Sequence, residues 1–173
     1  MDNNSISRKS FLSRTLLLAP AMIFAPGMAF AQQKEKPPAI DPTIVKEFVR
    51  IAHSDFEKVK QMLEEYPLLL NASWDWGGGD YETAMNAAGH VGQKDIANYL
   101  LSKGVRADIF ALTMLGKTEI VKSMLKEYPA LLNSLGPHGF TLLHHAEKGG
   151  KDSEELLSYF QAEGLKETKR MLY

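Results

Sequence analysis

The stretch MLEEYPLLLN at residues 62–71 decides the fold, because it recurs 62 residues later as MLKEYPALLN at residues 124–133. The two copies differ at only two of their ten positions. In each copy a proline, Pro67 or Pro129, has no amide hydrogen with which to continue a helix, so the preceding helix ends there. A helix end that repeats within one chain predicts a repeated structural unit.

Apolar residues recur at helical spacing around these copies. One apolar stripe runs from Val45 to Ala52 and the next from Phe56 to Leu63, with the period of amphipathic helices. No stretch alternates between polar and apolar residues over a useful strand length. We therefore predict an all-α fold whose helix pairs stack on one another, because a single pair cannot bury its apolar faces alone.

Two stretches carry the motif of a known repeat. The ankyrin repeat opens with threonine, leucine, histidine and alanine, has a glycine between its two helices and closes with another glycine. The chain resembles this family over about residues 44–166, and residues 72–80 and 136–139 look like those of a group of bacterial, exported ankyrin-repeat proteins. Leu142 stands where the motif has proline, and Ala84 and Asn86 also depart from it. The matching residues that we regard as structural are Thr83, Ala88, Gly92, Gly104, Thr141, Leu143, His144 and Ala146.

The resemblance implies a solenoid of about four helix pairs. Equivalent residues of the second helices, Val59, Ala97, Val121 and Leu157, are spaced by 38, 24 and 36 residues, around the usual ~33. It also implies that His144 hydrogen-bonds between neighbouring turns. We place a polar, proline-rich linker at residues 32–41, the repeat domain at 42–166 and a C-terminal helical end at 167–173.

The first 31 residues have the pattern of an export signal. Cations at Arg8, Lys9 and Arg14 precede an apolar stretch that ends in small residues at Ala29 and Ala31, which predicts cleavage after Ala31. Residues 7–12, SRKSFL, resemble the twin-arginine motif with Lys9 in place of the second arginine, so the twin-arginine and general secretion routes both stay open. We expect a periplasmic or otherwise exported protein, with an uncleaved membrane anchor as the alternative.

The amino-acid composition limits the kinds of site and partner that the chain can have. The chain has no cysteine, which excludes disulfides, thiolate metal sites and cysteine nucleophiles. Removal of the signal takes away three of 20 cations and one of 21 anions, which leaves the domain acidic. A domain without excess positive charge is not typical of nucleic-acid binding. We expect a monomer without stable membrane insertion after cleavage.

The unequal repeat spacing predicts a binding loop. The long loop between the first two helix pairs contains two tryptophans and three consecutive glycines, whereas the next loop is almost absent. Exposed aromatic side chains supply rigid contact area typical of interaction hot spots. The alternative is that the tryptophans fold back and cap the first pairs. The predicted partner-binding residues of the loop are Trp74, Asp75, Trp76, Asp80 and Tyr81.

The ankyrin resemblance also implies which first-helix positions line a concave groove. The expected outward-facing strip mixes apolar and imidazole side chains, and such a surface suits a protein or peptide partner. It comprises His53, Ala87, His90, Val91, Ala111, Met114, Leu115, His145 and Lys148, and we add His138 from a nearby loop to the binding residues.

Metal or small-molecule binding is the first alternative function, since imidazole suits zinc, copper and nickel. The possible ligands are His53, His90, His138 and His145, but they belong to separate repeats and none forms a helical i, i+4 pair. We therefore expect neither a metal site nor a cofactor. An accessory role in stabilising an exported enzyme is the second alternative.

The sequence offers only weak evidence for a catalytic site. Asp75 or Asp80 with His90 or His138 could form a carboxylate–imidazole pair, but the residues from Asp80 to Thr83 are more simply a turn and helix cap. The three glycines lack the lysine and serine or threonine of a phosphate-binding loop. The sequence therefore predicts no catalytic residues and favours a non-enzymatic protein-interaction module with an unidentified protein partner.

Overall fold

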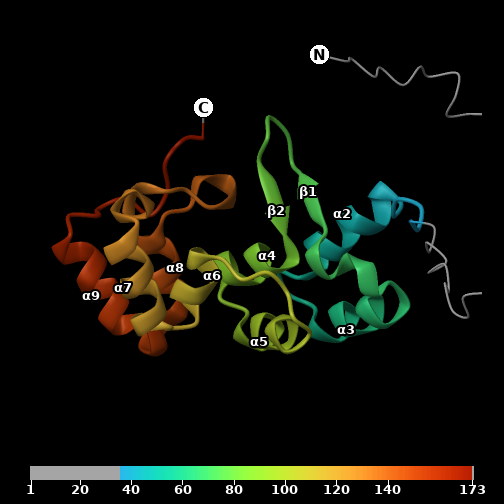
Figure 1. The fold of residues 1–173 in the computed structure, drawn as a ribbon, viewed down its shortest axis with the longest axis horizontal. Coiled ribbons are helices and arrows are strands. Elements are labelled where there is room, and N and C mark those ends of the chain that lie inside the picture. Colours follow the sequence, from blue (N-terminus) through green and yellow to red (C-terminus); the bar gives the residue numbers. More distant parts are fainter. Residues whose placement is uncertain (1–35, 173) are drawn as a thin grey trace, which may run out of the picture. The chain divides into compact units, whose positions relative to one another are not determined.

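The computed structural model describes residues 36–172, and this part of the chain is mostly helical (Figure 1). The predicted all-α class is confirmed at this level. The predicted signal and the first residues of the linker lie outside the described part. The α-helices are α2 (Pro42–Ile51), α3 (Phe56–Glu65), α4 (Ala84–Val91), α5 (Lys94–Ser102), α6 (Ile109–Met114), α7 (Thr118–Glu127), α8 (Leu142–Gly149) and α9 (Glu154–Ala162).

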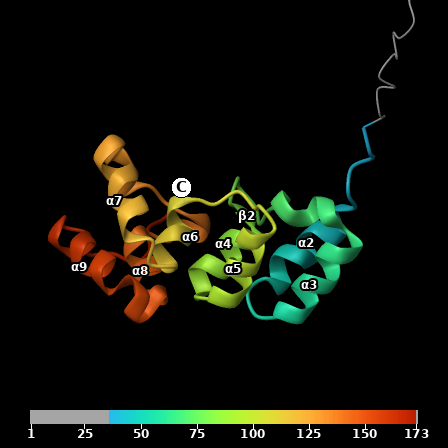
Figure 2. The same ribbon diagram turned by 60° about the horizontal axis from the view of Figure 1, so that its bottom comes forward.

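The helices pack as antiparallel neighbours along the chain. Contacts join α2 to α3, α4 to α5, α6 to α7 and α8 to α9. The first members of these pairs also contact one another in the order α2, α4, α6, α8, and α4 additionally contacts α8 (Figure 2). Helices from distant parts of the sequence therefore meet around α4.

The repeated stretch adopts the same conformation twice. After α3 and after α7, a tyrosine with non-helical backbone angles leads into a short 3₁₀ helix that begins with proline, η1 (Pro67–Asn71) and η2 (Pro129–Asn133). The backbone angles of the two tyrosines, Tyr66 and Tyr128, agree within 1°. The helix ends predicted from the two prolines are thus confirmed.

Polar side chains cap the N-termini of several helices. The side chains of Asp41, Asp55 and Asp108 accept hydrogen bonds from first-turn amides of α2, α3 and α6. Thr83 and Thr141 do the same for α4 and α8. These caps satisfy amide groups that have no partner within the helix, so they fix where each helix starts.

Small residues allow the first helices to approach closely. Ala87, Ala88 and Ala111 are fully buried, and a Cβ atom added to Gly89 would lie 3.4 Å from the Cα of Ala111. Buried apolar side chains from α2 to α6 form one core cluster, and those from α6 to α9 form a second.

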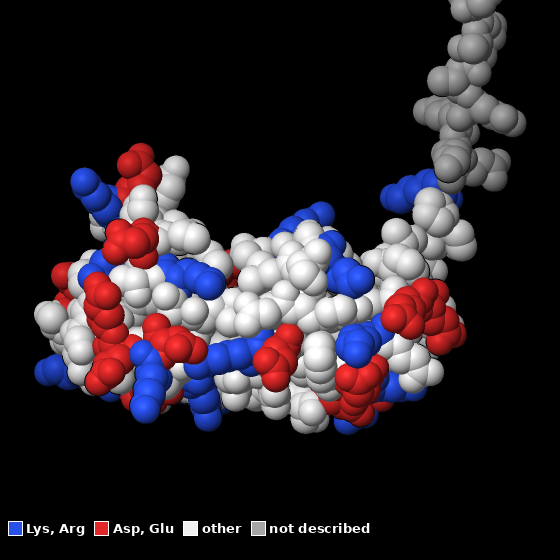
Figure 3. Space-filling view, turned by 90° about the horizontal axis from the view of Figure 1, so that it is seen from below, with Lys and Arg blue, Asp and Glu red and all other residues white. Residues whose placement is uncertain are grey.

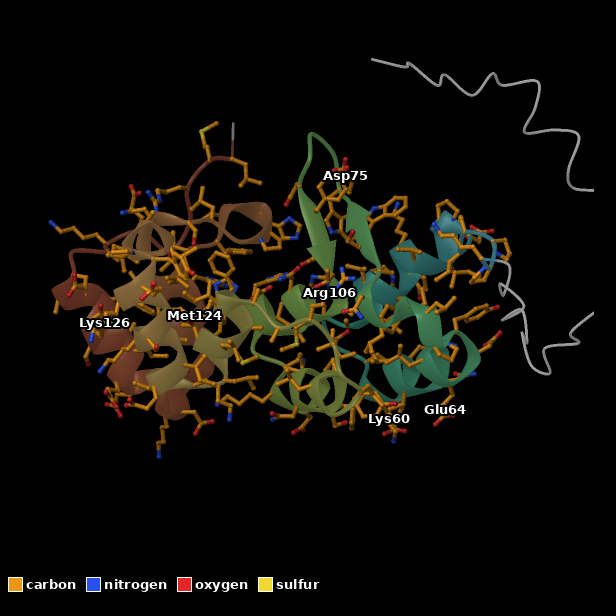
Figure 4. The ribbon with its side chains drawn as sticks, viewed as in Figure 1. Lys60, Glu64, Asp75, Arg106, Met124 and Lys126 are labelled. Carbon is orange, nitrogen blue, oxygen red and sulfur yellow. The ribbon has the colours of Figure 1, made fainter. Side chains whose placement is uncertain are left out.

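A short β-hairpin occupies the loop between the first two helix pairs, and the sequence pattern did not predict it. Strands β1 (Ser73–Asp75) and β2 (Tyr81–Thr83) pair antiparallel, with Trp74 opposite Glu82. The glycines 77–79 all have positive φ angles, which a turn of this kind requires. Figure 4 shows Asp75 on this hairpin, well away from Lys60 and Glu64 on α3.

The prediction of a helical C-terminal end is wrong for the described residues, because residues 165–172 contain no helix. They run beside residues 139–141 instead: the amide of Thr141 donates to the carbonyl of Thr168, and the amide of Arg170 donates to that of Gly139. Backbone partners in the neighbouring loop take the place of a local helix.

Several side chains that the sequence predicted to point outward are buried in the structure. Met114 and His145 are fully inaccessible, and Leu115 is buried, as are Ala87, His90 and Ala111. They lie on α4, α6 and α8 or, for Leu115, directly after α6, and the mutual contacts of these helices cover them. Val91 is half-buried and Lys148 is exposed.

The outer surface carries mixed charge. In the view of Figure 3, acidic and basic side chains are interspersed over the described residues. Within residues 36–172, no helix is long and apolar enough to cross a membrane.

Gly149 tests the tight packing between α8 and α6. A Cβ atom at this position would lie 2.4 Å from the carbonyl oxygen of Met114 and 2.0 Å from the hydroxyl of Ser153. Alanine favours a helix more than glycine does, but the added Cβ atom would overpack this contact. We therefore expect Gly149→Ala to lower the free energy of unfolding, measured by urea denaturation, by about 1–3 kcal/mol. Gly89→Ala, whose Cβ would make ordinary contacts, is the control and should cost less; equal stability of the Gly149 variant and the parent would contradict this packing.

His145 makes stability depend on pH. Its Nδ1 donates to the carbonyl of Thr141 at 2.8 Å, its Nε2 has no partner, and burial lowers the pKa of His145 to about 4. The unfolded chain takes up this proton near pH 6.5, so the folded state loses stability as the pH falls from 6.5 towards 4.

Between pH 7 and pH 5 this residue should account for about 2 kcal/mol of that loss. Urea unfolding of the parent and of His145→Gln at both pH values measures it, since other groups cancel in the comparison. The variant should lose less stability on acidification, and equal losses would refute the assignment.

Candidate metal centre

Four side chains from separate elements converge beneath the β-hairpin. They are His53 in the turn after α2, Glu82 on β2, His90 on α4 and His138 in the 3₁₀ turn η3 (Pro137–Gly139). One potential ligand atom from each lies within 4.8 Å of all the others. Glu82 is fully buried and His90 is 8% exposed, whereas His53 and His138 are half-buried. The group is therefore closed on one side and accessible on the other.

The end of α2 orients His53. Its Nδ1 lies 3.2 Å from the carbonyl oxygen of Val49 and 3.0 Å from that of Arg50. A carbonyl oxygen only accepts hydrogen bonds, so Nδ1 carries the proton. In the neutral ring, Nε2 then presents its lone pair to the cluster.

Asp80 orients His138 in the same manner. The carboxylate accepts a hydrogen bond from the backbone amide of His138 at 2.8 Å and another from its Nδ1 at 2.6 Å. His138 has a φ angle of 59°, which is uncommon for a residue with a side chain. The neutral ring again presents Nε2, which lies 3.4 Å from Oε1 of Glu82. A carboxylate that holds the far nitrogen of a histidine is typical of metal sites.

Glu82 provides the negative charge of the cluster. Its Oε2 accepts a hydrogen bond from the indole nitrogen of Trp76 at 2.7 Å. Its Oε1 lies 2.8 Å from Nε2 of His90 and 3.6 Å from Nε2 of His53, yet it is buried with no aligned hydrogen-bond donor. An unpaired buried carboxylate oxygen is costly, and a cation between the four atoms would satisfy it.

The pKa of Glu82 is set by opposing effects. Burial raises it, but the contact with His90 at a hydrogen-bonding distance of 2.8 Å, the hydrogen bond from Trp76 and the charges that His53 and His90 carry when protonated together outweigh burial and lower the pKa below its ordinary value. Glu82 is therefore ionised at neutral pH.

His90 links the cluster to α8. Its Nε2 lies 3.0 Å from Nε2 of His53, and its carbonyl accepts a hydrogen bond from Nε2 of His144 at 2.8 Å. Phe140 stacks on the His90 ring at 5.1 Å and on the His144 ring at 4.0 Å. A proton on Nε2 of His90 could serve His53 or Glu82 but not both, whereas a metal ion would be contacted by all of these atoms.

The donor set and its spacing suit a transition metal. Three imidazole nitrogens and one carboxylate oxygen bind zinc, copper or nickel. Bonds of about 2.0–2.2 Å place tetrahedral donors about 3.3 Å apart. Four donor pairs in the cluster are separated by 2.8 to 3.6 Å, so small adjustments would bring all four atoms into coordination.

The structure thus groups residues that the sequence distributed over separate repeats. Trp76, Asp80, His90 and His138, expected to bind a partner, belong to this cluster or support it. His53 had been a possible ligand, and Glu82 was missed because it precedes the helix cap at Thr83. No sequence pattern could have identified it, because on β2 the tyrosine is exposed and the glutamate is buried, the reverse of what hydrophobicity alone predicts.

The other predicted binding residues lie outside the cluster. Trp74 is half-buried against the first core, and Tyr81 is 61% exposed. Asp75 accepts hydrogen bonds from the amides of Gly77 and Gly79, which supports the hairpin turn. His145 is buried between Phe110 and the start of α8, with no atom in the cluster.

The residues that the repeat motif marks as structural are helix caps, buried side chains and glycines with positive φ angles. Thr83 and Thr141 are helix caps, Ala88, Leu143 and Ala146 are buried, and Gly92 and Gly104 have positive φ angles. His144 joins α8 to α4 through a hydrogen bond to the carbonyl of His90, between the fourth and the second helix pairs.

Comparisons with models of protein families, with curated protein sequences and with solved structures found no match.

Asp80 tests whether the orientation of His138 matters for metal binding. Loss of such a supporting carboxylate typically lowers metal affinity about 10–100-fold, and we expect this for Asp80→Asn in a zinc titration against a chromophoric chelator. Asp75→Asn is the matched control, since Asp75 lies on the same hairpin and bonds only the turn. Equal affinities of the two variants would contradict the role given to Asp80.

Proposed function

We propose that this protein binds a divalent transition-metal ion, of the zinc, copper or nickel class, through His53, Glu82, His90 and His138. The observation that carries the proposal is the buried Oε1 atom of Glu82, which has three imidazole Nε2 atoms within 3.6 Å and no hydrogen-bond partner. Most of the groove expected to bind a protein partner is buried, so the structure favours the metal site over that surface.

The supporting hydrogen bonds favour a metal over a purely structural cluster. His53 and His138 both use Nδ1 for a hydrogen bond to the protein and direct Nε2 inward. Metal-binding histidines commonly have this arrangement, because the second bond fixes the tautomer and the ring orientation.

Zinc binding to tag-free protein tests the proposal by isothermal titration calorimetry. We expect one ion per chain, with affinity reduced at least about tenfold in Glu82→Gln and in His90→Gln, since each removes one ligand. His145→Gln is the matched control, because it removes a histidine outside the cluster and should bind as the parent does. Absence of binding, or equal affinity in all four proteins, would refute the proposal.

Thermal unfolding provides a second measurement. A ligand that binds only the folded state at 100 times its Kd adds about 2.7 kcal/mol of stability, which corresponds to several degrees in Tm for a domain of this size. Zinc should therefore raise the Tm of the parent and of His145→Gln, and the rise should be smaller in Glu82→Gln. A uniform shift in all three would indicate binding elsewhere.

We further propose that the helix pairs form an ankyrin-type repeat stack and that the protein is exported to the periplasm. The agreement of the caps Thr83 and Thr141 with the repeat motif supports the first point, and the sequence of residues 1–31 supports the second.

Partner binding is a second candidate for the hairpin alone. Tyr81 is 61% exposed and Trp76 is 37% exposed, and aromatic side chains of this kind are typical contact residues. A pull-down from periplasm with the parent and with Tyr81→Ala tests it, and equal recovery of every captured protein would remove this candidate.

A further inference from the structure

One side of the proposed metal centre opens onto a hollow in the surface. The hollow has a volume of about 450 Å³ and is lined by Arg50, His53, Ser54, Trp76 and His138. Two of these residues are proposed ligands, whereas the other two ligands, Glu82 and His90, are buried beneath them. A metal ion bound to the four donors would therefore have its accessible side towards this hollow.

Two cations of α2 lie beside the hollow. Arg50 lines it directly, and Nζ of Lys46, one helical turn earlier, lies 5.5 Å from the ring centre of Trp74 and 6.0 Å from that of Trp76. The Arg50 guanidinium is paired with Glu47 through two contacts of 2.7 Å. This pair leaves part of the guanidinium fork free for a second acceptor.

The charges favour an anionic ligand once a metal is bound. Lys46 and Arg50 lie near the centre beside the hollow, and Lys169 and Arg170 line a second hollow together with Asp80 and His138. The nearby anions are Glu47, Asp80 and Glu82. A divalent ion adds two positive charges to this group, so its formal charge is positive. An oxyanion could then contact the metal and the guanidinium together, and Arg is well suited to carboxylate and phosphate oxygens.

Resting on the proposed function, we infer that the metal keeps an open coordination position towards the hollow and that a small oxyanion, a carboxylate or a phosphate, binds there. The ligand would place one oxygen on the metal and another near Arg50. Zinc sites sometimes expand from four to five ligands, and the oxyanion would be the fifth. The Trp76 ring forms a wall of the hollow, and its indole nitrogen is already used by Glu82.

Cobalt(II) substitution tests this inference, because the visible absorption of cobalt reports the number and type of its ligands. Cobalt is first titrated into tag-free protein, and inorganic phosphate or acetate is then added to the cobalt-loaded protein. We expect a saturable spectral change with at least one of the two anions. The anion that causes it identifies the ligand class.

The matched variants are Arg50→Gln and Lys58→Gln. Lys58 is an exposed cation on α3 that contacts Gln61, so its loss changes the net charge equally without altering the hollow. Arg50→Gln should bind cobalt as the parent does and bind the anion at least about fivefold more weakly, whereas Lys58→Gln should match the parent in both.

The two proposals fail in different ways. Cobalt that binds without any spectral response to millimolar phosphate or acetate overturns the open position alone. An equal anion affinity in Arg50→Gln and Lys58→Gln overturns the role of Arg50. Failure of cobalt and zinc to bind at all overturns the proposed function and, with it, this inference.

Discussion

The Glu82 carboxylate is the group around which the site is organised. It lies fully inside the protein, where a charge without compensation is expensive. Trp76 satisfies one oxygen by a hydrogen bond, while three imidazole nitrogens approach the other without an aligned donor. The hairpin, the turn after α2 and the 136–140 loop each place a side chain next to this carboxylate.

The elements that hold these imidazoles are anchored independently of the cluster. Asp80 on the hairpin binds both the backbone and the ring of His138. The extended C-terminal residues support the same loop from the other side through the bridge between Phe140 and Lys169. A Cβ atom at Gly139 would lie 1.9 Å from the carbonyl oxygen of Arg170, so only glycine permits this approach. The ligands are thus positioned before any ion binds.

The sequence predicted the helices well and the site poorly. Apolar periodicity and the two tyrosine–proline stretches act locally, so the helix pairs and the turns after α3 and α7 follow from them. The strands of the hairpin have three residues each, too few for a periodic signal. His53, His90 and His138 are 37 and 48 residues apart, and tertiary contacts bring them together, among them those of α4 with α2 and α8 and the hydrogen bonds of Asp80 to His138. The C-terminal residues were wrongly expected to be helical because their partners lie in a distant loop.

The central claim is that four named atoms bind one ion. Crystals of the protein grown with zinc, with diffraction recorded on both sides of the zinc absorption edge, test it most directly. The account predicts one anomalous peak about 2.0–2.2 Å from Nε2 of His53, His90 and His138 and from Oε1 of Glu82. A zinc-loaded crystal whose peak lies elsewhere, or whose Glu82 carboxylate makes an ordinary hydrogen bond in place of a metal contact, would contradict it.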